Sequence, residues 1–134
     1  MRPIPEILRQ AKTVAVVGWS EKTDRPSHWI AEYLQRAGYA VTRVNPGLAQ
    51  RGIAGVAAAI PQGTDVVDVF RSPEHVPEVV SEAIAAGAKV VWLQPGAENE
   101  AAAAMARAAG LEAVVGECIY LEHRRHFGID EGTY

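Results

Sequence analysis

A short segment near the N-terminus combines a glycine, two hydroxyl side chains and two cations. These residues are Gly18, Ser20, Lys22, Arg25 and Ser27. Glycine permits a tight turn and lets a ligand come close to the backbone. Backbone N–H groups and hydroxyls at the start of a helix attract anions, and nearby cations strengthen that attraction. The segment therefore predicts a phosphate site between a strand and a helix.

The glycine pattern of a dinucleotide-binding loop is incomplete in this segment. Of the three glycines in G-x-G-x-x-G, only Gly18 is present, and Ser20 and Thr23 occupy the other two positions. Taken alone, these residues are equally compatible with an ordinary turn between a strand and a helix, followed by a solvated loop.

The composition predicts one globular domain over residues 1–134. The chain has 134 residues, of which 49% are hydrophobic, enough for one sizeable core. A net charge of −3 gives no general attraction to nucleic acid. No apolar run approaches the roughly 20 residues of a membrane span, and the N-terminus lacks the apolar region of a signal peptide.

Cysteine usage favours a reducing compartment. Cys118 is the only cysteine, so an intrachain disulfide is impossible. We therefore expect a cytoplasmic protein that interacts with neither membranes nor nucleic acid.

Hydrophobic patterning predicts an α/β fold that alternates strands and helices. The expected strands span residues 13–18, 40–44, 65–70, 89–93 and 113–115. Glycines 38, 87 and 110 each end a predicted helix just before a strand. Such joints predict a Rossmann-like, open, parallel five-stranded sheet, ordered 3-2-1-4-5, with helices on both faces.

The helices are expected between these strands. A short one precedes the first strand, and the next begins near Pro26 and buries an apolar face that includes Trp29, which we interpret as core packing. One short helix is expected within 48–62. A turn at 73–75 precedes a helix that begins near Pro77, because proline is tolerated in the first turn. Two more helices are expected at 98–109 and near 122–126.

In such sheets, ligands bind beyond the carboxyl ends of the strands. Polar, glycine and proline residues follow each of the five predicted strands. They are Gly18, Trp19 and Ser20; Asn45 and Pro46; Phe70 and Arg71; Gln94, Pro95 and Gly96; and Cys118. A nucleotide cleft is therefore predicted at this edge of the sheet.

The residues after the second strand argue against a nicotinamide cofactor. NAD-binding folds place Asp or Glu there to hold the ribose hydroxyls. This chain has Asn45 and Pro46 instead. The preceding Arg43 either meets a ribose phosphate or is an ordinary surface residue.

Motifs along most of the chain resemble the small stand-alone CoA-binding proteins, which are similar to the CoA-binding domain of the succinyl-CoA synthetase α subunit. These motifs are Gly18-Trp19-Ser20, Arg25-Pro26-Ser27, Val44-Asn45-Pro46, Asp68-Val69-Phe70-Arg71, Gly87 to Gln94, and Cys118. The resemblance implies a Rossmann-type domain that binds coenzyme A.

The same resemblance implies roles for individual positions. Gly18, Trp19 and Ser20 would bind the CoA phosphates. Asn45 and Pro46 would border the nucleotide, Phe70 and Arg71 would border the cleft, and residues 94–96 would contact the pantetheine arm.

No catalytic constellation stands out. Ser20 lacks a recognisable histidine–acid pair, and the phosphohistidine domain of the synthetases is absent. His123 and His126 with Glu122 have a spacing that could hold a metal, but a solvated tail is the simpler interpretation, and we predict no metal site.

The sequence thus predicts a CoA- or acyl-CoA-binding protein without evident catalytic machinery. Two alternatives stay open: an NAD(P)-binding redox or sensor domain, and the CoA-binding subunit of a multi-chain acyl-CoA ligase. Homo-oligomerisation also stays open.

Overall fold

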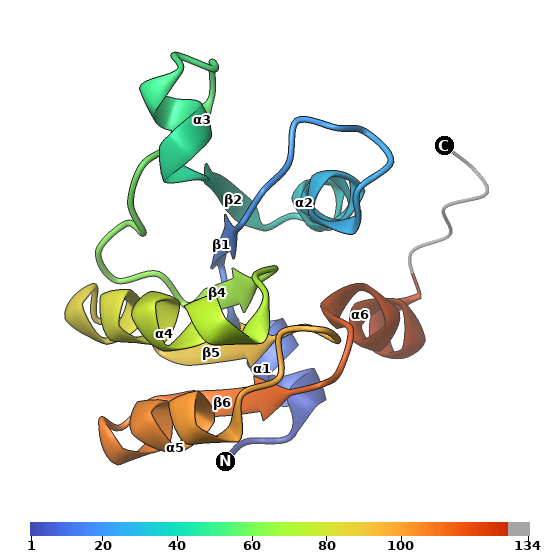
Figure 1. Cartoon of the computed structure of the whole chain (residues 1–134). Helices are drawn as coiled ribbons and strands as arrows, with labels where there is room; N and C mark the ends of the chain where they lie inside the picture. The colour runs from blue at the N-terminus through green and yellow to red at the C-terminus, as the bar shows by residue number, and fades with distance from the viewer. Residues whose placement is uncertain (129–134) are drawn as a thin grey trace.

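The computed structural model describes residues 1–128 and is built around a parallel sheet of six strands (Figure 1). The strands are β1 (Thr13–Val17), β2 (Ala40–Val44), β3 (Val56–Ala57), β4 (Val66–Val69), β5 (Val90–Leu93) and β6 (Glu112–Val115). Their order is β3-β2-β1-β4-β5-β6, and every neighbouring pair is parallel. The predicted Rossmann-like α/β class is confirmed.

The edge of the sheet beside β2 differs in detail from the prediction. The third strand in sequence order is Val56–Ala57, which pairs with Arg43 and Val44, so the sheet has six strands rather than five. The segment 65–70, expected at that edge, instead provides β4, which pairs with β1 in the middle of the sheet. A two-residue strand at an edge leaves almost no periodic signal in the sequence.

The short helix expected within 48–62 lies earlier, at α3 (Pro46–Gln50). The Asn45 side chain accepts a hydrogen bond from the Leu48 N–H at 3.1 Å, and Pro46 occupies the first helical position. Both features stabilise a helix start. Residues 45–47 therefore form the beginning of a helix.

Helices cover both faces of the sheet (Figure 1). α1 (Ile4–Gln10), α2 (Pro26–Arg36) and α6 (Ile119–Phe127) pack on one face. α4 (Val76–Ala85) and α5 (Glu100–Ala108) pack on the other. A single 3₁₀ turn at Pro73–His75 precedes α4, close to the predicted start.

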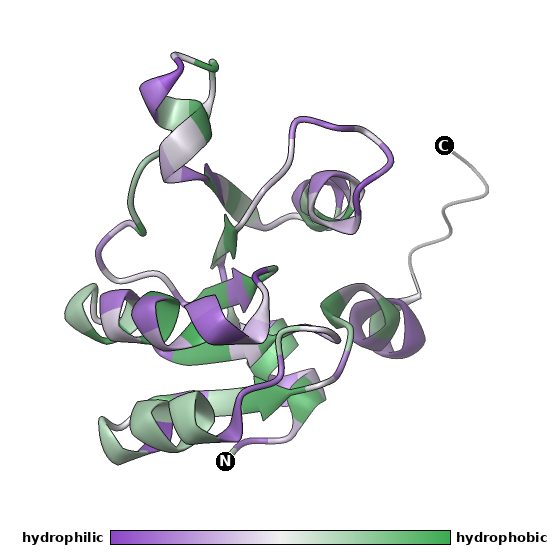
Figure 2. Cartoon of the chain, in the orientation of Figure 1, coloured by the Kyte–Doolittle hydropathy of each residue, from purple (hydrophilic) through white to green (hydrophobic). Residues whose placement is uncertain are grey.

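Strand residues alternate between two apolar layers. Val14 and Val16 of β1 face the layer of α1, α2 and α6, whereas Ala15 and Val17 face the layer of α4 and α5. Figure 2 shows hydrophobic residues along most of β5 and β6. Because both faces are covered, these strands are continuous apolar runs rather than alternating patterns.

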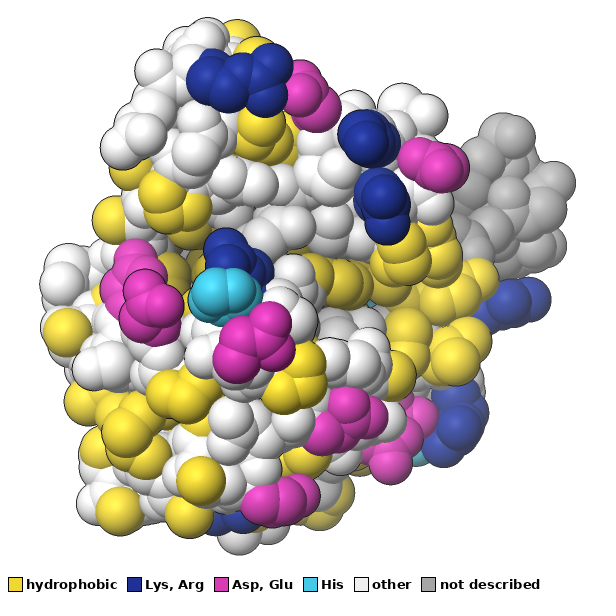
Figure 3. Space-filling model, in the orientation of Figure 1, with side chains coloured by type: hydrophobic (Ala, Val, Ile, Leu, Met, Phe, Trp, Pro, Cys, Tyr) yellow, Lys and Arg dark blue, Asp and Glu magenta, His cyan; other side chains and the backbone are white. Residues whose placement is uncertain are grey.

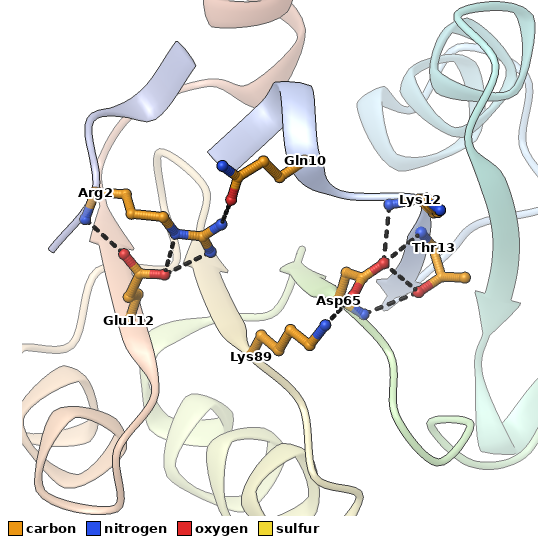
Figure 4. Close-up of polar contacts among 7 residues, drawn as sticks. All are labelled: Arg2, Gln10, Lys12, Thr13, Asp65, Lys89 and Glu112. Atoms are coloured by element: carbon orange, nitrogen blue, oxygen red, sulfur yellow. Dashed lines mark hydrogen bonds and ion pairs between the residues drawn. The ribbon is translucent and has the colours of Figure 1, made fainter. Parts of the chain in front are cut away.

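Polar contacts connect the amino ends of the strands (Figure 4). Asp65 Oδ2 accepts hydrogen bonds from the backbone N–H groups of Lys12 and Thr13 at 2.8 and 3.0 Å. Glu112 accepts hydrogen bonds from the Arg2 backbone N–H and side chain. These contacts join α1, β1, β4 and β6 at the amino ends of the strands, opposite to the predicted cleft.

Within residues 1–128, no helix is both long and apolar enough to cross a membrane.

Candidate ligand-binding cavity

A cavity of about 570 Å³ opens at the carboxyl ends of β1, β4 and β5. It lies beside α2 and the start of α6, which Figure 1 shows on the same side of the sheet. Its lining consists of Gly18, Ser20, Lys22, Arg25, Pro26, Ser27, Trp29, Ile30, Phe70, Gln94, Pro95 and Cys118. The fold therefore brings together nine of the fourteen residues predicted for the ligand site.

The polar end of the cavity is the loop between β1 and α2. The Ser20 N–H donates to Ser27 Oγ at 3.0 Å, and the Lys22 N–H donates to Ser20 Oγ at 3.1 Å. His28 Nδ1 lies 2.8 Å from the Ser20 carbonyl oxygen, so this nitrogen carries the proton and donates. These bonds give the loop a defined shape while its two cations stay exposed.

Two basic side chains line this end of the cavity. Lys22 and Arg25 are exposed, and neither has an ion-pair partner among residues 1–128. α2 has no acidic residue in its first turn and no side-chain cap on its N–H groups. An eleven-residue helix with an uncapped N-terminus beside two cations is an environment that favours an anion.

Gly18 is required by the fold as well as by any ligand. Its φ is +87°, and a Cβ there would lie 2.2 Å from the carbonyl oxygen of Phe70. The end of β1 therefore packs directly against the backbone that follows β4. This close approach gives the floor of the cavity its shape.

The rest of the lining is largely apolar. It includes Trp29 and Ile30 of α2, together with Phe70, Pro95 and Cys118 from the segments that follow the strands. Ile30 is buried, whereas Trp29, Phe70 and Cys118 each keep part of their surface exposed. The cavity lining thus combines a basic loop with an apolar part.

Gln94 offers a buried donor to the cavity. Its side chain is 4% exposed, and its Oε1 accepts a hydrogen bond from the Ile119 N–H at 2.9 Å. A backbone N–H can only donate, so the amide oxygen must face Ile119. The amide NH₂ is then the half available to a carbonyl group of a ligand.

Five predicted residues lie outside this lining: Trp19, Asn45, Pro46, Arg71 and Gly96. The Asn45 side chain caps α3 and donates to the Trp19 carbonyl oxygen at 2.8 Å. Trp19 itself is buried and stacks on His28, with ring centroids 5.2 Å apart. The Gly96 N–H donates to Glu98. Ligand contacts by these five residues stay a prediction.

Three lining residues were not predicted for the site: Pro26, Trp29 and Ile30. Trp29 was interpreted as core packing because it belongs to the apolar stripe of α2. It also packs edge-on against Tyr120, with ring centroids 5.0 Å apart. Its position in the first turn of α2, next to the loop of residues 20–25, is the signal that could have identified it.

The histidines of α6 form a packing cluster. His123 is buried, and its Nδ1 lies 2.8 Å from the Tyr33 hydroxyl oxygen. Burial holds the pKa of His123 below its usual value. Glu122 pairs with Arg125 at 3.0 Å. In the described part of the chain, no group of three or more His, Cys, Asp or Glu side chains could hold a metal ion.

Comparison with known proteins gives a consistent result. The sequence model of a family described as "CoA binding domain" matches residues 12–124. An uncharacterized protein of Bacillus subtilis (strain 168), YneT, is 37% identical over 123 residues, which cover 90% of this chain and 91% of that protein.

Solved structures share the fold. A hypothetical protein from Pyrococcus horikoshii OT3 superimposes with a TM-score of 0.86 at 37% identity, over 96% of this chain and 98% of the other. A structure from Thermus thermophilus gives a TM-score of 0.85 at 32% identity, over 94% of this chain and 100% of the other.

Proposed function

Because the chain belongs to the CoA binding domain family, we propose that it binds coenzyme A in the cavity at the carboxyl ends of the strands. The observation that carries this location is that the cavity lining combines a basic loop with an apolar part. CoA has a diphosphate at one part of its length and a less polar pantetheine arm at another. The lining offers a surface suited to each.

Each part of the cavity lining has a defined role in this proposal. The hydroxyls of Ser20 and Ser27 and the charges of Lys22 and Arg25 bind the diphosphate. The pantetheine arm passes Phe70, Pro95 and Cys118, and Gln94 donates its NH₂ to an amide oxygen of the arm. Trp19 also contacts the phosphates, Asn45 and Pro46 border the nucleotide, Arg71 borders the cleft, and Gly96 contacts the pantetheine arm.

The proposal includes binding but no catalysis by the chain itself. A nucleophilic serine needs a base within hydrogen-bond reach of its hydroxyl. His28 instead bonds the carbonyl oxygen of Ser20, and the Ser20 hydroxyl accepts the Lys22 N–H. The Ser20 hydroxyl therefore stabilises the conformation of the loop.

CoA is favoured over NAD by the residue that follows β2. Asn45 stands where NAD-binding folds have a carboxylate, and its side chain is already engaged by the Leu48 N–H and the Trp19 carbonyl. No acidic side chain at this position is available to the ribose hydroxyls.

Isothermal titration with CoA and with NAD tests the proposal. We expect CoA to bind, and the double variant Lys22→Ala/Arg25→Ala to weaken binding at least about tenfold, because a hydrogen bond to a charged group contributes about 1.5–3 kcal/mol. Lys12→Ala, at the amino ends of the strands, is the control and should leave CoA affinity unchanged. Tighter binding of NAD than of CoA would overturn the proposal.

A further inference from the structure

The apolar part of the cavity lining continues, through Trp29, onto the surface between α2 and α6. Trp29 packs edge-on against Tyr120 of α6, with ring centroids 5.0 Å apart. Both rings keep part of their surface exposed, as do Phe70 and Cys118 inside the cavity. Figure 3 shows hydrophobic side chains gathered on this side of the molecule, below basic side chains. We call the surface formed by Trp29, Tyr120 and Leu121 the α2–α6 seam.

Leu121 extends this surface away from the cavity. It is 52% exposed and is one of four large hydrophobic residues exposed within residues 1–128, the others being Met1, Met105 and Phe127. Cys118 is the N-cap of α6, and Leu121 stands three residues later. Helical side chains tilt toward the N-terminus of the helix, so Leu121 leans back toward the start of α6. Tyr120 and Leu121 thus place apolar side chains at the start of α6, next to Cys118, which lines the cavity.

These surfaces together specify a chemical type of ligand. The basic loop, the Gln94 amide and Cys118 line one cavity, and Trp29 joins that cavity to the seam. A pantetheine arm laid from the loop toward Cys118 would bring its sulfur to the start of the seam. A group attached to that sulfur would then lie against Trp29 and Leu121.

We propose that the ligand is a CoA thioester with an aliphatic acyl chain, and that this chain lies on the α2–α6 seam. The inference rests on the proposed function, since it requires CoA to bind in the cavity. It goes further because it explains why a large aliphatic side chain is exposed beside the cavity.

Titrations with CoA, acetyl-CoA and octanoyl-CoA test the inference. Each methylene that becomes buried increases affinity about fourfold. Burial of two methylenes on the seam therefore accounts for a gain of about sixteenfold, and we expect octanoyl-CoA to bind at least about tenfold more tightly than acetyl-CoA. Free octanoate at the same concentration should not compete with CoA, because it lacks the groups that the loop binds.

Leu121→Asp places a charge on the seam without disturbing the core, since Leu121 is exposed. We expect this variant to lose most of the preference for octanoyl-CoA over acetyl-CoA. Met105→Asp, at an exposed position of α5 on the other face of the sheet, is the matched control and should keep the preference.

The outcomes separate the two proposals. If CoA binds and octanoyl-CoA gains nothing over acetyl-CoA, the inference is wrong and the proposed function stands. A gain that survives Leu121→Asp also overturns it, because the acyl chain would then lie elsewhere. If CoA, acetyl-CoA and octanoyl-CoA all fail to bind, the proposed function fails as well.

Discussion

Asp68 is a carboxylic acid in the middle of the sheet with no polar partner among the described residues. It is 0% exposed, pairs in register with Val16 and Trp92, and neither of its oxygens has a hydrogen-bond partner. It lies on the same side of its strand as Phe70, two residues from the cavity lining. Burial raises the pKa of the Asp68 carboxyl well above its usual value, so the folded protein keeps it protonated.

Asp68 should make the folded protein less stable as the pH rises. The unfolded chain releases this proton near pH 4, whereas the folded chain retains it to a much higher pH. Between those two values the free energy of unfolding falls by up to about 1.4 kcal/mol per pH unit. In urea unfolding, Asp68→Asn should therefore gain stability relative to the parent as the pH increases from 4 to 8.

The control for this prediction is Asp24→Asn, an exposed position in the loop after β1, which should follow the parent at every pH. A stability difference for Asp68→Asn that does not change with pH would show that the carboxyl is ionised in the folded state.

At the scale of elements, Asp65 joins the starts of β1 and β4. Besides the Lys12 and Thr13 N–H groups, its carboxylate accepts the Thr13 hydroxyl at 3.2 Å and pairs with Lys89 at 3.2 Å (Figure 4). Burial acts to raise the pKa of Asp65, but these donors outweigh it and hold the pKa below its usual value. The register of two central strands therefore depends on an ionised carboxylate.

Asp65→Ala should lower the free energy of unfolding by about 2 kcal/mol at pH 7, because two backbone donors lose a charged acceptor. The lowered pKa means that this stability is present above about pH 4 and is lost as the pH falls further. Urea unfolding at pH 7 and pH 3 measures both effects.

Lys89→Ala is the matched control, since it removes only an ion pair whose lysine side chain is 68% exposed. It should cost less than about 1 kcal/mol. An equal loss from both variants would mean that the ion pair, rather than the backbone bonds, stabilises this junction.

At the scale of the whole molecule, the amino ends and the carboxyl ends of the strands carry different features. The polar network of Asp65 and Glu112 joins the amino ends of the strands. The cavity and its cationic loop occupy the carboxyl ends. A ligand bound at the carboxyl ends can therefore add to the stability that the polar contacts at the amino ends supply.

CoA at 100 times its dissociation constant should add about 2.7 kcal/mol to the folded state, which raises Tm by roughly 10 °C for a chain of this size. ADP with a 3′-phosphate should retain part of the effect, because it keeps the diphosphate for the loop. NAD should give a much smaller shift, since Asn45 replaces the acidic ribose anchor. Differential scanning fluorimetry compares all three, and equal shifts from NAD and CoA would contradict the assignment.

Local patterns in the sequence were sufficient for the class of fold and for the polar end of the cavity. The apolar run 14–17, the glycines that end helices, and the turn before Pro77 each act over a few residues. Ser20, Lys22 and Arg25 lie in one loop and Ser27 lies in the first turn of the helix that follows it, so their proximity follows from the chain itself. The same is true of the predicted strand ends, because parallel strands place their carboxyl ends together.

Tertiary structure decided the features that depend on partners distant in sequence. Val56–Ala57 is a strand only because the edge of β2 is free to pair with it, and β4 takes the place beside β1. Trp29 combines a core contact with a cavity surface because Tyr120 reaches it from α6. Asp68 carries no local sign of its isolation, since Val16 and Trp92 come from two other strands. Spacing along the chain encodes which face a residue presents, whereas burial, pairing and pKa depend on what the rest of the chain places against that face.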